Sequence, residues 1–296
     1  MLLSNGKYSQ WNEDNPVHFV GHSAGAQVIR ILQQMLADKA FKGYEESNAK
    51  WIASITTLSG APNDWRYAKG ISPLGLFCFA VTIYVWLDIP LLKRYYNFGF
   101  DHFHMSRKNI GFWGLVECLS GNAGPFVSSD WVIPDLTIQG STQINRQLNT
   151  FPDTYYFSYV TKATKQVEGK VVPKRMQTSD IFSHIHTLWI CKWCYPTNVQ
   201  LPYNEYKDED WWDNDGQLNV ISMTHPRLPI EHPHCYVPNG LQLEPQPGVW
   251  CCEMVEAYHV QFVLSIRAES HIHQLYGTIF KRCRNLDTKR SLQSVT

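Results

Sequence analysis

A serine flanked by two glycines near the start of the sequence is the residue best placed for chemistry. Gly21-His22-Ser23-Ala24-Gly25 has the spacing G-x-S-x-G, which puts a serine hydroxyl on a sharp turn between a strand and a helix. We expect the turn to strain the Ser23 backbone, and a Cβ at either flanking glycine to collide with the neighbouring strand or helix. The start of the helix would favour negative charge beside the hydroxyl. The pattern therefore predicts a serine nucleophile.

This serine needs a base, and the base needs a carboxylate that orients it. Where a serine stands on such a turn, the chain order is serine, then Asp or Glu, then His. His259 lies late in the chain, just ahead of an apolar run, so a loop after the last strands can place it over the serine. For the acid, Asp213 and Asp215 share one tight turn, and Gly216 suits a loop that points Asp215 inward. From the residues alone, either aspartate could be the acid. The two could instead only cap the turn or form a weak cation-binding loop.

A second group of side chains has the residue types of a metal site. Two histidines and two cysteines lie close together at His184, His186, Cys191 and Cys194. Their spacing matches no standard zinc finger, so a zinc-binding module is kept as an alternative function.

The remaining histidines and cysteines carry simpler expectations. Three histidines lie in a Pro-rich loop and are expected to be solvated: His225, His232 and His234. Cys251 and Cys252 are adjacent, so on an extended strand they would point to opposite faces and act as packing residues. Eight cysteines in 296 residues are too few for a disulfide scaffold.

The elements that must position these residues alternate along the chain. Apolar, β-branched or aromatic runs predict strands at 16–20, 51–58 and 155–161. Apolar residues on helical spacing predict helices at 26–36, 143–149 and 273–284. Between them, 165–250 is expected to be rich in loops. The alternation predicts an α/β fold with a mainly parallel sheet and helices on both faces.

Length and charge limit the classes of protein to which the chain can belong. The 296 residues show no internal repeat or low-complexity linker, so we expect a single domain over 1–296. The 26 basic and 26 acidic residues balance, so we expect no nucleic-acid partner. The first eight residues are mostly polar and no Asn-x-Ser/Thr site occurs, so we expect no signal peptide and favour a cytoplasmic location.

An apolar stretch at 71–92 is about as long as a membrane-spanning helix. Pro73, Asp88 and Pro90 interrupt it, and a carboxylate is costly in hydrocarbon. We therefore expect a buried or partly exposed helix, inside an insertion at about 65–130 that is rich in aromatic residues.

Five stretches, spread over most of the chain, carry a family resemblance. They are VHFVGHSAGAQVIRILQQML, SITTLSGAP, DLTIQGSTQINRQLNTFPDTYYFSYVT, WWDNDGQLNVISMTHP and PGVWCCEMVEAYHVQFVL. In these stretches and in their order, the chain resembles the thermoalkalophilic bacterial triacylglycerol lipases and looks like a plant relative of them. The resemblance implies an α/β-hydrolase fold and a catalytic triad of Ser23, Asp215 and His259, so it selects Asp215 over Asp213.

The resemblance also implies metal sites that the residues do not complete. Where the family has an Asp before its histidine and a carboxylate that helps to bind calcium, this chain has Tyr258 and Gln261. Asp135 matches one of the family's four zinc ligands, and the sequence offers no counterpart of the other three. Since one carboxylate does not hold zinc against water, we expect neither metal and no cofactor.

The family's oxyanion hole needs two donors. The backbone N–H of Ala24 is one, and a loop that follows an early strand supplies the other. We expect the chain to be N-terminally truncated and to lack this loop, a loss that typically costs about a hundred- to a thousandfold in rate. The strand at 17–20 would then form a sheet edge with exposed apolar side chains.

The leading interpretation is a serine carboxylester hydrolase that acts on lipid esters, with activity impaired by the truncation. The insertion at about 65–130 would form its lid, and the segment 71–92 would make transient contact with a lipid surface. The main alternative is a non-catalytic, lipase-like protein that binds a lipid or a protein partner.

Overall fold

The computed structural model describes most of the chain in separate stretches. These are residues 8, 10–61, 104–105, 107–119, 122–124, 127, 135, 137–174, 181–195, 201, 203–238, 243–263 and 270–293. Much of the expected lid region at 65–130, and the whole apolar segment 71–92, lie outside the described residues.

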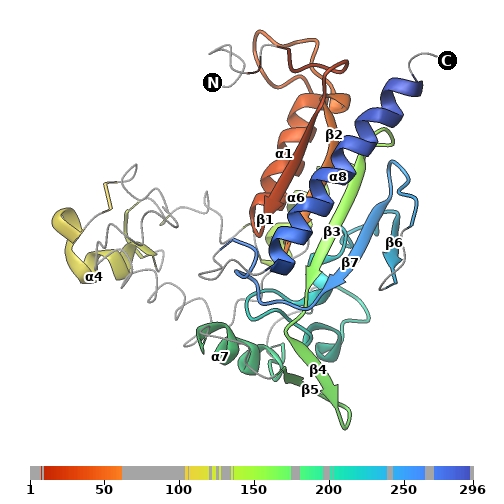
Figure 1. Ribbon diagram of the computed structural model, residues 1–296. Helices are drawn as coiled ribbons and strands as arrows, with labels where there is room; N and C mark the ends of the chain where they lie inside the picture. The colour runs from red at the N-terminus through yellow and green to blue at the C-terminus, as the bar shows by residue number, and fades with distance from the viewer. Residues whose placement is uncertain are drawn as a thin grey trace.

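Parallel strands form the central sheet (Figure 1). In spatial order they are β1 (Val17–His22), β2 (Ile52–Leu58), β3 (Tyr155–Thr161), β7 (Trp250–Val255) and β6 (His234–Val237). Every neighbouring pair in this sheet is parallel, which confirms the predicted mainly parallel sheet. A separate antiparallel ribbon consists of β4 (Thr164–Val167) and β5 (Lys170–Pro173). Because the sheet is parallel, the carboxyl ends of its strands meet at one edge.

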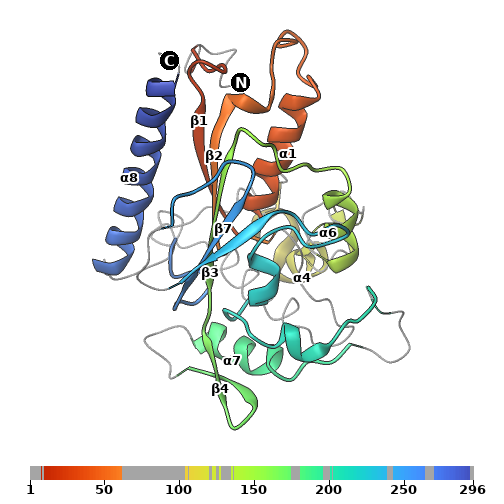
Figure 2. The same ribbon diagram turned by 90° about the vertical axis from the view of Figure 1, so that its right-hand side faces the viewer.

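Helices cover both faces of this sheet (Figure 2). One face carries α1 (Gly25–Ala37) and the other carries α8 (Ser270–Gln293). The other described helices are α4 (Arg107–Leu119), α6 (Ile138–Asn145) and α7 (Ile181–Ile190), with 3-10 helices η1 (Ala49–Trp51), η4 (Asp208–Trp211) and η5 (Val220–Met223). Coverage of both faces explains why β2 is buried along its whole length.

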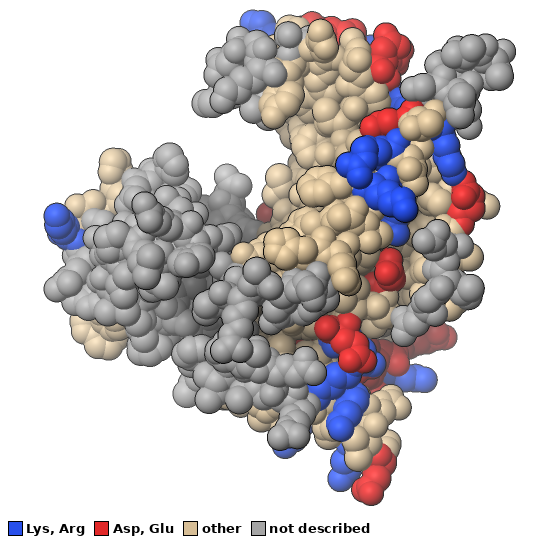
Figure 3. Space-filling model, viewed as in Figure 1, with Lys and Arg blue, Asp and Glu red and all other residues tan. Residues whose placement is uncertain are grey.

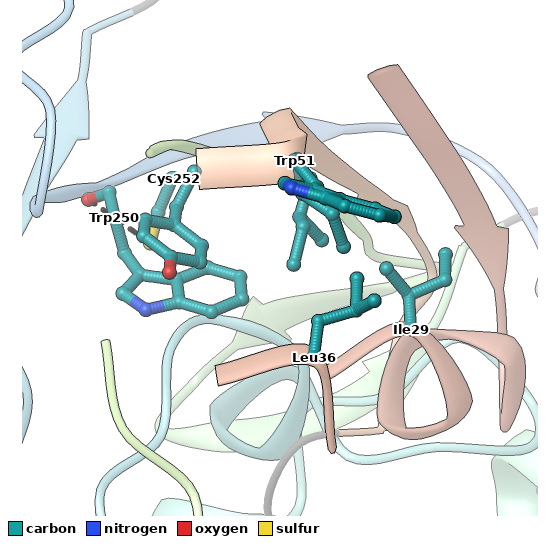
Figure 4. Close-up of a cluster of buried hydrophobic side chains, with 8 residues drawn as sticks. Ile29, Leu36, Trp51, Trp250 and Cys252 are labelled. Atoms are coloured by element: carbon teal, nitrogen blue, oxygen red, sulfur yellow. Dashed lines mark hydrogen bonds between the residues drawn. The ribbon is translucent and has the colours of Figure 1, made fainter. Parts of the chain in front are cut away.

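Large side chains from distant segments build the core on the α1 face (Figure 4). Ile29 and Leu36 of α1 face Trp51, while Trp250 and Cys252 of β7 complete the cluster. Burial of each large apolar side chain contributes roughly 1.5–3 kcal/mol, so this cluster is a main source of stability around α1.

The opposite face of β7 packs under α8. Cys251 lies there with Phe157 of β3 and Leu286 of α8, and Cys252 lies on the α1 face. The prediction that the two cysteines pack on opposite faces is therefore confirmed.

In the part of the chain that the structure describes, β1 is an edge strand. Its only strand neighbour there is β2, and Val20 is 40% exposed. Phe19 is half-buried against the core of the α1 face. The expected sheet edge with exposed apolar side chain is confirmed for Val20, within the described residues.

Several elements differ from the sequence-based expectation. The helix expected at 143–149 is α6, which begins at Ile138 because Thr137 Oγ1 accepts the Gly140 N–H at 3.0 Å and caps it. The terminal helix is longer than the expected 273–284. The expectation of a loop-rich 165–250 was incomplete, since this stretch contains α7 and β6.

Basic side chains gather over the C-terminal half of α8 with acidic ones beside them, and the hairpin of β4 and β5 carries both signs (Figure 3). No helix among the described residues combines the length and the apolarity that a membrane crossing requires.

Candidate active site

Ser23 stands on a strained turn between β1 and α1. Its φ is 55°, in the left-handed region that residues with a side chain rarely adopt. The Ser23 N–H donates to Leu58 O of β2 at 3.1 Å, and its carbonyl accepts the N–H groups of Ala26 at 3.1 Å and Ala61 at 3.3 Å. Hydrogen bonds from two segments thus hold the strained residue, and its side chain is half-buried.

The two glycines of the motif differ in what they are needed for. A Cβ on Gly21 would lie 2.6 Å from Ile29 Cδ1 and 2.7 Å from the Gly25 carbonyl oxygen, so Gly21 permits the close approach of strand and helix. A Cβ on Gly25 would meet nothing within 4 Å. The expected collision is therefore correct for Gly21 and wrong for Gly25, because the side chain at the start of the helix would point into open space.

Ala24 presents its backbone N–H at the beginning of α1. It is the N-cap residue, and no hydrogen bond from its N–H occurs within the described part of the chain. The first N–H groups of a helix have no partner inside the helix and carry partial positive charge. This position suits a developing oxyanion next to Ser23.

The loop after η4 turns the carboxylate of Asp215 inward. Asp215 Oδ1 accepts the N–H groups of Gln217 at 3.0 Å and Leu218 at 2.8 Å, and Asp215 is fully buried. Gly216 has φ 91°, and a Cβ there would lie 2.7 Å from Ser183 O. Gly216 is thus required both by the backbone conformation and by the contact with α7.

Asp215 and His259 are joined twice. His259 Nδ1 donates to Asp215 Oδ2 at 2.8 Å, and the His259 backbone N–H donates to Asp215 O at 3.0 Å. Thr161 Oγ1, at the end of β3, donates to the same Oδ2 at 2.5 Å. Burial alone would raise the pKa of Asp215, but the charge and hydrogen bond of His259 and the donors Thr161 and Leu218 together lower it. Asp215 is therefore a buried carboxylate, and it fixes the ring of His259 with Nε2 facing away from it.

Asp213 has different partners. Its carboxylate contacts Lys162 Nζ at 2.6 Å and Thr164 Oγ1 at 2.6 Å, and it is partly exposed. It makes no contact with His259 within the described residues, so the structure separates the two aspartates that the residues alone left open.

His259 lies beside the serine turn. The rings of His22 and His259 are 4.8 Å apart between centroids, and His22 Nε2 donates to His259 O at 2.8 Å. Ala24 packs against the cluster that contains Leu218 from the loop of Asp215. Within the described residues, Ser23 Oγ and His259 make no hydrogen bond.

Three polar residues of this site were not predicted from the sequence. They are His22, Ser59 and Thr161. Ser59, with φ 46°, follows β2, and its Oγ lies 2.9 Å from Thr161 Oγ1 and 3.5 Å from His259 O. Burial and then the nearby charge of His259 lower the pKa of His22 to about 4, so His22 is neutral near pH 7. The signal that could have found them is position, since each lies at the carboxyl end of a predicted parallel strand.

The other histidine and cysteine clusters differ from expectation. Among the described residues, the one group of three or more metal-binding side chains that lie together is His225, Glu231 and His234. The His184–Cys194 cluster therefore does not come together as a zinc site there. His225 is fully buried and stacks on His234, with 3.6 Å between ring centroids. His232 is half-buried, with Nδ1 2.5 Å from Thr150 Oγ1. The expectation of solvated loop histidines was therefore wrong, because ring stacking and side-chain partners bury these three side chains wholly or in part.

The structure thus combines an α/β fold, built on a parallel sheet, with a serine turn beside a buried Asp–His pair. The turn and the pair lie at the carboxyl ends of the strands. The chain belongs to the family described as lipase-like, C-terminal domain, whose family model matches residues 3–276.

Curated relatives are bacterial lipases. A lipase of Staphylococcus epidermidis is 28% identical over 250 residues, and lipase 1 of Staphylococcus aureus is 25% identical over 243 residues. Each match covers 75% of this chain and 32% of the relative, so the chain spans about a third of the length of the curated relatives it matches.

Solved structures agree in fold. Staphylococcus hyicus lipase matches with a TM-score of 0.65 and 22% identity, over 95% of this chain and 73% of that chain. EstA from Clostridium botulinum matches with a TM-score of 0.65 and 21% identity, over 92% of this chain and 65% of that chain. At such identity the likeness shows the α/β fold.

Proposed function

We propose that this chain hydrolyses carboxylic esters of lipids, with Ser23 as nucleophile, His259 as general base and Asp215 as the acid that orients the base. The observation that carries the proposal is the buried hydrogen bond between Asp215 Oδ2 and His259 Nδ1, 2.8 Å long, beside the strained Ser23 turn. Membership of a lipase-like family supports ester hydrolysis in general.

In the proposed reaction, Ser23 Oγ attacks the acyl carbonyl carbon and its proton passes to His259 Nε2. The oxyanion that forms accepts a hydrogen bond from the Ala24 N–H. His259 then gives the proton to the leaving alcohol, which leaves an acyl group on Ser23. Water, deprotonated by His259, attacks this acyl group and restores the free serine.

Asp215 acts through His259. Because His259 Nδ1 donates to Asp215, Nε2 is the nitrogen with a lone pair, and it is the atom that must face Ser23. The buried carboxylate also stabilises the imidazolium that forms during attack.

We also propose that the sheet belongs to an α/β-hydrolase fold in a single domain, with a lid at about 65–130 and contact with a lipid surface through 71–92.

Turnover of a p-nitrophenyl ester by the full chain tests the proposal. Ser23→Ala should abolish hydrolysis, and Asp215→Asn should lower kcat by about 10⁴-fold because the base loses its orienting charge. Asp213→Asn is the matched control, since Asp213 bonds to Lys162 and Thr164, and it should keep most of the activity. Activity that survives Ser23→Ala, or equal losses in the two Asp→Asn variants, would refute the assignment.

A non-catalytic, lipase-like binding protein is the second candidate. The observation that favours it is that no hydrogen bond joins Ser23 Oγ to His259 within the described residues. It predicts that the full chain binds ester-containing vesicles but releases no acid, and that Ser23→Ala binds them equally well.

A further inference from the structure

Three side chains with metal-ligand atoms lie close together in the segment that joins η5 to β6. His225 follows η5, Glu231 lies in the loop and His234 opens β6. One ligand atom from each lies within 4.8 Å of the others, and His225 Nε2 is 3.0 Å from Glu231 Oε1. These residues take no part in the proposed ester hydrolysis.

We propose that His225, Glu231 and His234 bind a divalent transition-metal ion, with Zn²⁺ as the ion that suits them best. Two imidazole nitrogens and one carboxylate oxygen are ligands that Zn²⁺ prefers, and three protein ligands leave a fourth position for water. These three residues are distinct from Asp135 and from the His184–Cys194 cluster, the two places where the sequence analysis considered a zinc site.

His234 has its second ring nitrogen held as metal-binding histidines usually do. Its Nδ1 donates to His232 O at 3.0 Å, which leaves Nε2 with the lone pair. A backbone carbonyl or carboxylate that fixes the other ring nitrogen is the common outer partner of a histidine ligand.

The loop that carries the three residues is held in shape without an ion. His232 N donates to Pro226 O at 2.9 Å, and Trp250 N donates to Pro233 O at 2.9 Å. Three prolines in the ten residues 225–234 further restrict the backbone. Because the backbone already holds the three residues close together, binding of an ion would require little further ordering of the loop.

The rearrangement required for binding involves side chains only. Two ligand atoms about 2.1 Å from a tetrahedral ion are roughly 3.4 Å apart, so His225 Nε2 and Glu231 Oε1 must separate by a few tenths of an ångström. The ion would take the place of the proton that His225 Nε2 shares with Glu231, and His225 would change to the tautomer that carries its proton on Nδ1. The rings of His225 and His234 are nearly parallel, at 8°, so the partly exposed His234 must turn its ring to aim Nε2 at the ion.

One neighbouring charge opposes binding. Arg227 Nη2 lies 3.8 Å from Glu231 Oε1, so a cation already competes for this carboxylate. Removing that charge should therefore tighten binding.

A bound ion would connect β6 to η5. Met223, the last residue of η5, has its sulfur 3.4 Å from Thr161 Oγ1, the donor to Asp215. The ion would thus stabilise the segment that packs beside the acid, without touching the reacting groups.

Calorimetric titration of the chelator-treated full chain with ZnCl₂ tests this site. We expect one equivalent to bind with a dissociation constant of ~10⁻⁶ M or below. Glu231→Gln and His234→Ala should each weaken binding at least tenfold, and Arg227→Gln should strengthen it. His273→Gln removes an exposed histidine of α8 and should leave the constant unchanged. Because Glu231 is half-exposed, its variant tests the site even if His234→Ala does not fold.

Co²⁺ in place of Zn²⁺ provides a second readout. Its absorption should lack the charge-transfer band of a cobalt–thiolate bond, because no cysteine belongs to the set. Absence of binding to the full chain, wild-type affinity in both ligand variants, or a thiolate band would each overturn the proposal.

Discussion

Thr161→Val removes one hydrogen bond from the buried carboxylate and leaves the shape of the side chain almost unchanged. Thr161 Oγ1 is 2.5 Å from Asp215 Oδ2, and both residues have no exposed surface. A hydrogen bond to a charged group contributes about 1.5–3 kcal/mol, against about 0.5–1.5 kcal/mol between neutral groups. We therefore expect the free energy of unfolding to fall by about 2–3 kcal/mol, or about 3–5 °C in Tm for a chain of 296 residues.

Thr57→Val is the matched control, because Thr57 is equally buried on the next strand and donates to the neutral Ser158 Oγ at 3.1 Å. Urea unfolding of both variants and the parent measures the two losses, and Thr161→Val should cost about 1.5 kcal/mol more than Thr57→Val.

Thr161→Val should also change how the free energy of unfolding falls at acid pH. The lowered pKa of Asp215 means that its contribution is present above its unfolded pKa and is lost as pH falls through the folded value. Because Thr161 helps to lower that pKa, Thr161→Val should lose the contribution at a higher pH than the parent does. Equal costs for Thr161→Val and Thr57→Val, with an unchanged fall at acid pH, would refute the view that Thr161 supports a charged Asp215.

Further predictions concern the turns that present the site. Gly21→Ala should destabilise the chain by about 1–3 kcal/mol because its Cβ would overlap Ile29, whereas Gly25→Ala should be neutral or slightly stabilising; thermal unfolding compares them. Gly216→Ala should lower both stability and kcat, because φ 91° and the contact with α7 exclude a Cβ; unchanged ester turnover would contradict this. His22, with a pKa of about 4 when folded and 6.5 when unfolded, should cost stability as pH falls between these values, by at most about 1.4 kcal/mol per pH unit. Urea unfolding of His22→Gln at pH 7 and pH 5 should show a smaller loss than the parent.

Local pattern was enough to predict the elements around the serine. β1, α1 and β3 are long enough, and apolar enough in the right period, for the sequence to specify them. The boundary of α6 was missed because a cap decides it: Thr137 starts the helix five residues before the apolar spacing does.

The partners of the site depend on contacts between distant segments. The residues alone could not choose between Asp213 and Asp215, because the choice rests on Lys162 and Thr164 binding the first carboxylate and Thr161 binding the second. Burial of His225 was equally hidden, since it comes from stacking on a residue nine positions later. Such pairings follow from tertiary packing and leave no periodic trace in the sequence.

The position of β1 has a consequence for how the serine turn moves. In the described structure, β1 is held by β2 on one side and by α1. Alternate N–H groups of a strand point to opposite sides, so those that face away from β2 should exchange with deuterium well before the amides of β2. The turn that carries Ser23 could then loosen by local opening while the strands that carry Thr161 and lead to His259 stay protected. Exchange along β1 would thus report directly on whether any additional strand, from this protein or from a partner, docks beside the candidate nucleophile.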